Sequence, residues 1–216
     1  MNLELKKRII TSLILFTLLT LMYFYSYILI ISLIIIALIS WIEFYGLISK
    51  IYHKNKILKT SFKTFSMIYL SLLVFGILYI IANKPELKIF FLYSVLVSIF
   101  SDVGGLVFGK FFKGRKLTKI SPKKTISGSI GSFIFSLILI PFFNYPILNH
   151  ENFSLIIITF IISLTTQLGD LFISLMKRKA NVKNTSDLLP GHGGVLDRID
   201  GIIFAIPIGY LLLNHF

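Results

Sequence analysis

Residues 9–48 read IITSLILFTLLTLMYFYSYILIISLIIIALISWIEFYGLI, an apolar run that is almost unbroken. About 20 helical residues cross a hydrocarbon core about 30 Å thick, so this run is long enough for two membrane spans. The Tyr-rich cluster at 23–27 marks the division between them, because Tyr is enriched where a membrane meets water. The stretch therefore predicts helices over 9–26 and 28–48, joined by a tight hairpin.

The rest of the chain continues in the same way. Of its 216 residues, 56% are hydrophobic and 14% are charged, whereas soluble domains carry about 25% charged residues. Further apolar runs predict spans at 64–82, 88–109, 128–148, 153–176 and 197–214. The sequence therefore predicts an all-α fold: a polytopic transmembrane helical bundle of about seven spans, forming one integral membrane domain over residues 1–216.

Lys and Arg are distributed unevenly among the predicted loops. Of the 22 Lys and Arg residues, all but Lys84 and Lys88 fall at the N-terminus or in three loops, 50–63, 110–124 and 177–198, that share one side. Because loops rich in Lys and Arg stay in the cytoplasm, the N-terminus is expected to be cytoplasmic. The net charge of +13 then lies at that face, where it attracts anionic lipid headgroups. Nucleic-acid binding is a poor explanation, since no soluble domain is predicted to carry it.

The acidic residues are the most informative, because a carboxylate inside a membrane costs at least about 2.5 kcal/mol and is usually paired or functional. Asp102 lies in the fourth predicted span and Asp170 in the sixth, while Asp197 and Asp200 open the seventh and share one helix face. All four are expected at similar depth near the cytoplasm. Glu43, in the second span, fits a hydrogen bond or ion pair between helices as well as a functional role.

The carboxylates also indicate a type of ligand. The chain has no Cys, which excludes a thiolate metal site and a catalytic thiol, and it shows no His cluster. Carboxylates alone suit a hard cation with oxygen ligands, commonly Mg²⁺. Where Mg²⁺ meets Lys and Arg, the expected partner is a phosphate or pyrophosphate. The site is therefore expected to open to the cytoplasmic face.

The loop at 109–131 contains groups that can bind such a phosphate. Lys123 and Lys124 follow a rigid Ser-Pro, and Thr125 opens the next predicted helix. A helix N-terminus with free amide groups can bind an anion. An ordinary capped helix behind a basic loop is the alternative.

The loop at 177–198 contains a second set. Lys177 and Arg178 end the sixth span, and the glycines within 191–194 allow positive φ or a close approach to a ligand. His192 could donate to a phosphoryl oxygen or transfer a proton, or it could be structural. Arg198 could pair with a neighbouring aspartate or bind a phosphate in a bidentate manner.

Residues 174–200 resemble the signature of the phosphatidate cytidylyltransferase family, also called CDP-diacylglycerol synthases. The pattern runs Ser-x-x-Lys-Arg, four residues, Lys-Asp, a small residue, then Leu-Pro-x-His-Gly-Gly-x-x-Asp-Arg-x-Asp. It is matched, at the family's spacing, by Ser174, Lys177, Arg178, Lys183, Ser186, Leu189, Pro190, His192, Gly193, Gly194, Asp197, Arg198 and Asp200. Upstream, 169–171 and 120–125 also resemble family motifs. Asn184 stands where the pattern has Asp, and Ser127 where members usually have Glu.

The resemblance implies an enzyme that transfers CMP from CTP to phosphatidate, giving CDP-diacylglycerol and pyrophosphate. It implies Mg²⁺ as the cofactor, with a second cation left open, a homodimer, and a multi-pass location in the cell (inner) membrane with the active site facing the cytoplasm. It covers most of 98–205, the expected catalytic region, with N-terminal spans over 1–97.

The resemblance also implies residue roles. Asp170 and Asp197 are the expected metal ligands. The other expected catalytic residues are Asp200, Lys177, Arg178, His192 and Arg198. The expected substrate-binding residues are Ser121, Lys123, Lys124, Thr125, Lys183, Gly193, Gly194 and Asp102.

Two other interpretations stay open. One is another CTP-using lipid enzyme, such as a polyprenol kinase or a CDP-archaeol synthase, because the acceptor pocket cannot be identified from sequence. The other is a transporter or channel for a phosphorylated metabolite, which would predict paired repeats and polar residues reaching both membrane faces. No such repeat is evident, and the charged residues gather on one side.

Overall fold

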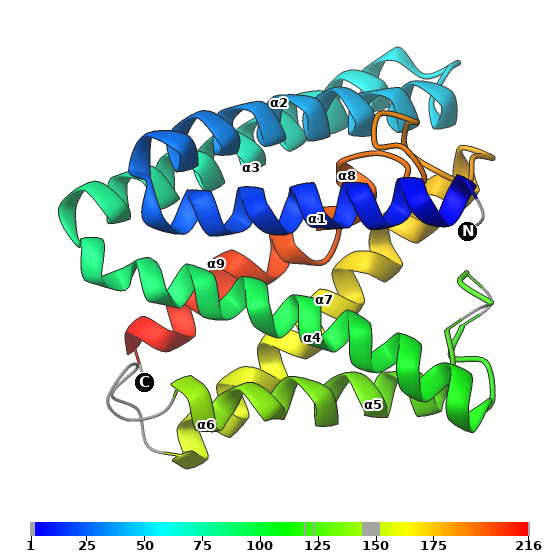
Figure 1. Ribbon diagram of the computed structural model, residues 1–216. Coiled ribbons are helices and arrows are strands. Elements are labelled where there is room, and N and C mark those ends of the chain that lie inside the picture. The colour runs from blue at the N-terminus through cyan, green and yellow to red at the C-terminus, as the bar shows by residue number, and fades with distance from the viewer. Residues whose placement is uncertain (1–2, 119, 123, 144–151, 216) are drawn as a thin grey trace. The chain divides into compact units, whose positions relative to one another are not determined.

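The computed structural model describes residues 3–118, 120–122, 124–143 and 152–215 (Figure 1). Within these ranges the regular elements are helical, so the predicted all-α class is confirmed. The elements are α1 (Leu3–Phe24), α2 (Ser26–Ile51), α3 (Lys56–Asn83), η1 (Pro85–Leu87), α4 (Lys88–Phe112), α5 (Ile126–Ser136), η2 (Leu137–Leu139), α6 (Ile140–Phe143), α7 (Asn152–Lys179), α8 (Leu196–Ile199) and α9 (Ile202–His215).

Five stretches of the described chain are helical, long and apolar enough to cross a membrane. They are Ser26–Ile51, Lys56–Asn83, Pro85–Phe112, Ile126–Phe143 and Phe153–Lys179. They correspond to the second to sixth predicted spans, although the end of the fifth, 144–148, lies outside the described residues. The first predicted span contains a shorter apolar helix, Ile9–Phe24. The chain is therefore a multi-pass membrane protein.

The seventh predicted span, 197–214, is wrong as a single helix. The structure divides it into α8 and α9, with Asp200 and Gly201 in the turn between them. Asp197 and Asp200 therefore do not share one face of one helix. Local chemistry favours the break, because Asp200 Oδ1 accepts from the Gly201 N–H (2.9 Å) and glycine is a poor helix former. The turn also packs closely, since a Cβ on Gly201 would lie 2.6 Å from the Thr166 side chain and 2.7 Å from the Thr166 carbonyl oxygen. The chain thus turns where it touches α7, a contact that the local sequence does not reveal.

The described chain divides into two compact units, Met1–Asn83 with Met176–Ile199, and Lys84–Leu175 with Asp200–Phe216. They are interleaved in sequence, because α7 contributes its first part to the second unit and its last residues to the first. The predicted division near residue 97 stays a prediction.

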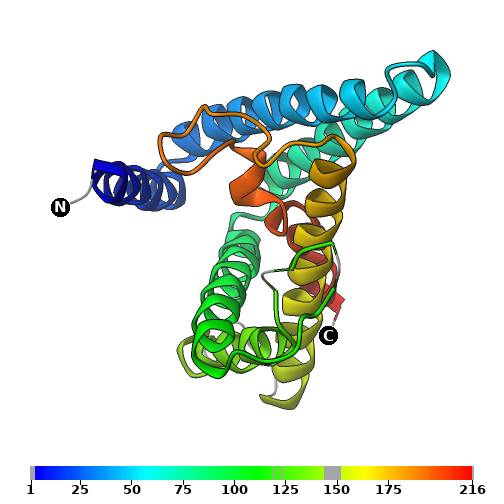
Figure 2. The same cartoon turned by 90° about the vertical axis from the view of Figure 1, so that its right-hand side faces the viewer.

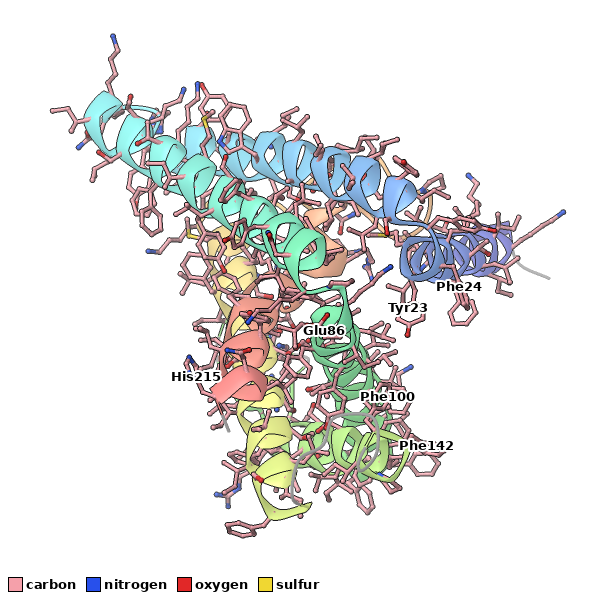
Figure 3. All side chains as sticks on the ribbon, turned by 90° about the vertical axis from the view of Figure 1, so that its left-hand side faces the viewer. Tyr23, Phe24, Glu86, Phe100, Phe142 and His215 are labelled. Carbon is pink, nitrogen blue, oxygen red and sulfur yellow. The ribbon has the colours of Figure 1, made fainter. Side chains whose placement is uncertain are left out.

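In the first unit, α1 packs on α2 and α2 packs on α3. The predicted hairpin is confirmed, because α1 ends at Phe24 and α2 begins at Ser26 after the extended Tyr25. Tyr23 and Phe24 meet edge to face beside this turn (Figure 3).

The third span begins earlier than predicted, at Lys56 rather than residue 64. The side chain of Asn55 accepts a hydrogen bond from the Leu58 backbone N–H (3.0 Å) and caps the helix. Lys63 therefore lies on α3, where its ammonium lies over the Trp41 and Tyr45 rings, 5.4 and 4.7 Å from their centroids. These cation–π contacts join the basic end of α3 to α2.

In the second unit, α5 runs beside α4 (Figures 1 and 2). Small residues form the contact: a Cβ on Gly104 would lie 2.5 Å from the Gly131 carbonyl oxygen, and one on Gly105 would lie 2.8 Å from the Ser132 hydroxyl. Small residues allow close approach of helix backbones inside a membrane, where packing replaces the hydrophobic driving force.

Buried hydroxyl groups join α4 to α7 in the same unit. The bonds link Tyr93 to Thr159, Ser98 to Thr166 and Ser101 to Ser163, with oxygen–oxygen distances of 2.5, 2.9 and 2.9 Å. Hydroxyl pairs between membrane helices contribute to their association because the apolar surroundings offer no competing water. They fix the register of α7, the helix that carries Asp170.

Candidate active site

The α7–α8 loop, residues 180–195, folds back on itself. The Leu189 N–H donates to the Gly193 carbonyl (2.8 Å), and the Gly193 N–H donates to the Leu189 carbonyl (3.1 Å). Between them Gly191 and Gly193 have φ of 74° and 88°, in the left-handed region that favours glycine. The predicted positive-φ role of glycine in this loop is therefore confirmed at these two positions.

Glu43 of α2 contacts this loop and the first residue of α8 through four hydrogen bonds. Its Oε2 accepts hydrogen bonds from the Thr185 hydroxyl (2.8 Å) and the Leu196 N–H (2.8 Å). Its Oε1 accepts from the Ser186 hydroxyl (2.6 Å) and the Val195 N–H (3.0 Å). The side chain is buried, with 6% relative exposure, and these four bonds satisfy it.

Asp197, in α8, forms a buried ion pair with Lys177, which lies near the end of α7. The Lys177 Nζ lies 2.6 Å from Asp197 Oδ1, and the side chains are 15% and 5% exposed. Asp197 Oδ2 accepts from the Gly194 N–H (3.0 Å), the Thr185 N–H (2.9 Å) and the Thr185 hydroxyl (3.0 Å).

These contacts decide the charge of Asp197. Burial alone would raise its pKa, but the hydrogen bonds from Lys177 and from the Gly194 and Thr185 backbones outweigh burial and hold the pKa below its ordinary value. The carboxylate is therefore ionised at neutral pH.

His192 and Arg198 form contacts that the sequence left open. Arg198 donates to the His192 carbonyl from Nε (3.1 Å) and Nη2 (2.7 Å), rather than pairing with an aspartate. His192 Nε2 lies 3.2 Å from the Ser12 hydroxyl, and Thr11 donates to the Pro190 carbonyl (3.0 Å), so α1 also supports this turn. His192 Nδ1 is buried and has no hydrogen-bond partner within the described part of the chain.

A second carboxylate–lysine pair lies in the other unit. Asp170 of α7 forms an ion pair with Lys124, and the Ser174 hydroxyl donates to Asp170 Oδ1 (3.2 Å). Thr125, the next residue after Lys124, caps α5 by accepting from the Gly128 N–H (3.0 Å). The helix cap that one interpretation expected is therefore present, and Lys124 contacts a carboxylate.

Neighbouring contacts fix Asp170. Three residues earlier on α7, Gln167 Oε1 accepts a hydrogen bond from the Ser129 hydroxyl (2.5 Å), which joins α7 to the first turns of α5. A Cβ on Gly169 would lie 2.9 Å from the Asp200 carbonyl oxygen, so this glycine permits close contact with the turn before α9. Asp200 is buried, and its Oδ1 accepts from the Gly201 N–H (2.9 Å).

The other predicted site residues are characterised by their exposure or by a turn. Asp102, Arg178 and Lys183 are exposed. Ser121 forms a turn, its carbonyl accepting from the Lys124 N–H (3.0 Å). Lys123 lies outside the described residues.

Comparison with known proteins identifies the family. The model of the "Cytidylyltransferase family" matches residues 2–216. The chain belongs to the cytidylyltransferase family. A protein of Staphylococcus haemolyticus named phosphatidate cytidylyltransferase is 40% identical over 140 residues, which are 64% of this chain and 54% of that protein. A Rickettsia prowazekii protein of the same name is 41% identical over 140 residues, 61% of this chain and 59% of that protein. The match thus spans little more than half of each relative.

As a member of this family, the chain has oxygen ligands that suit the expected Mg²⁺. No three His, Asp or Glu side chains gather as a metal cluster in the described ranges. Mg²⁺ needs fewer, because it commonly binds through one or two carboxylates together with water and substrate phosphates. Asp170, with the Ser174 hydroxyl beside it, fits this chemistry. Asp197 would offer Oδ1, which accepts from Lys177 Nζ alone among the described residues, whereas its Oδ2 already accepts three hydrogen bonds.

Glu43 and Thr185 are the residues around this candidate site that sequence reasoning did not assign to it. Glu43 was noted as a carboxylate in an apolar span, a signal that marks a constrained group but not its partners. Its partners lie at least 142 positions away along the chain. No sequence pattern at Thr185 indicates that this residue belongs to the site.

A Gly194→Ala substitution should destabilise the protein. A Cβ at this position would lie 2.0 Å from the Thr185 hydroxyl and 2.5 Å from Glu43 Oε2, so the α7–α8 loop must move. Overpacking of this kind costs about 1–3 kcal/mol, which a lower thermal unfolding midpoint in detergent would report. Gly46→Ala on α2, where the added Cβ would lie more than 4 Å from atoms outside its own stretch of helix, is the matched control. Equal midpoints for the two variants would contradict the described packing.

Proposed function

We propose that this chain is a phosphatidate cytidylyltransferase, which transfers CMP from CTP to phosphatidate and releases pyrophosphate. The observation that carries the proposal is the presence, within the family's motifs, of the carboxylate–lysine pairs Asp170–Lys124 and Asp197–Lys177. One helix, α7, supplies a member of each pair. The names of the relatives support the same activity.

In the proposed reaction a phosphate oxygen of phosphatidate attacks the α-phosphorus of CTP. A new P–O bond joins the lipid phosphate to CMP, and the bond to the β-phosphate breaks, so pyrophosphate leaves with the electron pair. No protein nucleophile is needed, because phosphoryl-type transfer depends mainly on positioning and charge stabilisation. Mg²⁺, held by Asp170 and Asp197, would neutralise phosphate charge, with a second cation left open.

The lysines have a defined part in this proposal. Lys124 and Lys177 pair with carboxylates in the structure, and we expect their ammonium groups to contact substrate phosphates during the reaction. Arg178, Lys183 and Arg198 carry further positive charge, and the buried His192 Nδ1 has no hydrogen-bond partner among the described residues. Further proposed contributors are Ser121, Lys123, Thr125, Gly193, Gly194, Asp102 and Asp200.

The topology belongs to the same proposal. The apolar helices Ile9–Phe24 and α9 would complete about seven spans, with the N-terminus and the site at the cytoplasmic face of the cell membrane. A membrane-held phosphate and a soluble triphosphate can meet there. We also propose a homodimer, as the family resemblance implies.

The proposal is tested by turnover of the purified chain in detergent. Cytosine-labelled CTP is mixed with Mg²⁺ and either phosphatidate or an ether-lipid phosphate, and label is counted in the lipid fraction. We expect label with phosphatidate and its loss in excess EDTA, which removes Mg²⁺ from its oxygen ligands. Label found only with the other acceptor would show that phosphatidate is not the substrate. No label with either acceptor would overturn the proposed activity.

A further inference from the structure

Glu43 is a carboxylate placed in a long apolar helix. All four of its hydrogen bonds come from uncharged groups, two hydroxyls and two backbone N–H groups, and each carboxylate oxygen accepts one of each kind. Burying a carboxylate is unfavourable, so a carboxylate in this position usually has a structural or functional role. All four donors lie in the segment from Thr185 to Leu196, which ends at the residue before Asp197.

Thr185 connects Glu43 directly to Asp197. Its hydroxyl oxygen lies 2.8 Å from Glu43 Oε2 and 3.0 Å from Asp197 Oδ2, so its single proton is shared between two carboxylates. Its backbone N–H also donates to Asp197 Oδ2 (2.9 Å). The contacts thus run from Glu43 through Thr185 to Asp197 and on to Lys177.

The backbone before Asp197 is fixed by the same carboxylate. Glu43 accepts from the N–H groups of Val195 and Leu196, the two residues that precede Asp197. Glu43 therefore constrains both the start of α8 and, through Thr185, the direction of the Asp197 side chain.

We infer that Glu43 is a positioning residue that orients Asp197 through Thr185. The inference rests on the proposed function, in which Asp197 takes part in cytidylyl transfer. Displacing a reacting or metal-binding group by about 1 Å can cost about 100-fold in rate, so a residue that fixes such a group affects turnover without touching substrate.

Three substitutions separate orientation from simple anchoring. Thr185→Val removes the hydroxyl that reaches both Glu43 and Asp197, whereas Ser186→Ala removes a hydroxyl that reaches Glu43 alone. In both variants the Glu43 oxygen that loses its hydroxyl donor keeps a backbone N–H donor. We therefore expect Thr185→Val and Ser186→Ala to have similar thermal midpoints. Thr185→Ser keeps the hydroxyl.

The decisive readout is kcat in the lipid-label assay. For Thr185→Val we expect a fall of about 10- to 100-fold with little change in the KM for CTP, because orientation rather than binding is lost. Thr185→Ser should stay within about threefold of the unsubstituted chain, since its hydrogen-bonding group is the same. Equal kcat for Thr185→Val and Ser186→Ala, or an equal loss in Thr185→Ser, would overturn the inference.

Glu43→Gln provides a second test. Each Glu43 oxygen accepts from a backbone N–H. Whichever way the Gln amide is turned, its NH₂ group would therefore face an N–H group, and two donors cannot hydrogen-bond to each other. We expect a loss of kcat at least as large as that of Thr185→Val, and faster hydrogen exchange at Val195 and Leu196. Unchanged kcat or exchange would overturn the inference. An unsubstituted chain that makes no lipid product would instead overturn the proposed function.

Discussion

Asp170→Asn should reduce turnover by about a thousandfold or more while the protein stays folded. The substitution keeps the size of the side chain and removes the negative charge that pairs with Lys124 and that we expect to bind Mg²⁺. Loss of metal-based charge neutralisation removes several kcal/mol of transition-state stabilisation, and each 1.36 kcal/mol is about tenfold in rate. Lys124 is 27% exposed, so water can solvate its ammonium once the partner charge is gone.

The control for Asp170→Asn is Glu86→Gln, which removes a negative charge from the exposed 3-10 turn before α4 (Figure 3). We expect this variant to keep the turnover and the thermal midpoint of the unsubstituted chain. Turnover of Asp170→Asn within about tenfold of that chain would contradict the metal-binding role, because one tenfold step is smaller than the expected electrostatic loss.

Asp197→Asn should lower both stability and turnover, and Lys177→Met added to it should restore stability alone. The Lys177–Asp197 pair is buried, with a 2.6 Å contact, so removing the carboxylate leaves an ammonium without its counter-charge. Breaking such a pair costs about 3–5 kcal/mol, whereas an apolar replacement of both partners is often tolerated. The Asn amide nitrogen would also face the Lys177 ammonium or the N–H donors of the loop.

Thermal midpoints and turnover of the two single variants and the double variant form a cycle for this pair. We expect the double variant to unfold at a higher temperature than Asp197→Asn and to stay inactive, because neither charge remains. A double variant that regains turnover would contradict the functional role of both residues. An unchanged midpoint in Asp197→Asn would contradict the buried pair.

The membrane helices could be predicted from sequence because their signal is local. An apolar run of sufficient length has few other structures available in a membrane, and the aromatic cluster at 23–27 marked the hairpin correctly. The third span was predicted too short, because Lys59 and Lys63 suggested a loop, whereas the helix extends back to the Asn55 cap. Basic residues at the end of a span are compatible with helix.

The contacts within the site could not be predicted in the same way. The motifs singled out these lysines and aspartates as candidates, but they did not indicate that Lys124 pairs with Asp170 and Lys177 with Asp197. The break before α9 coincides with a close contact of Gly201 with Thr166, and the hydrogen-bond partners of Glu43 lie far along the chain. Such contacts arise from packing between segments that are distant along the chain, and local sequence patterns do not reveal this packing.

Following the position of the transferred phosphorus is the most direct test of cytidylyl transfer. The purified chain is given phosphatidate, Mg²⁺ and CTP labelled at either the α- or the γ-phosphorus, and the lipid fraction is counted. We predict that the α-label enters the lipid and that the γ-label leaves in pyrophosphate. Entry of the γ-label would contradict this account, because it would show transfer of the terminal phosphoryl group, the reaction of a CTP-dependent kinase.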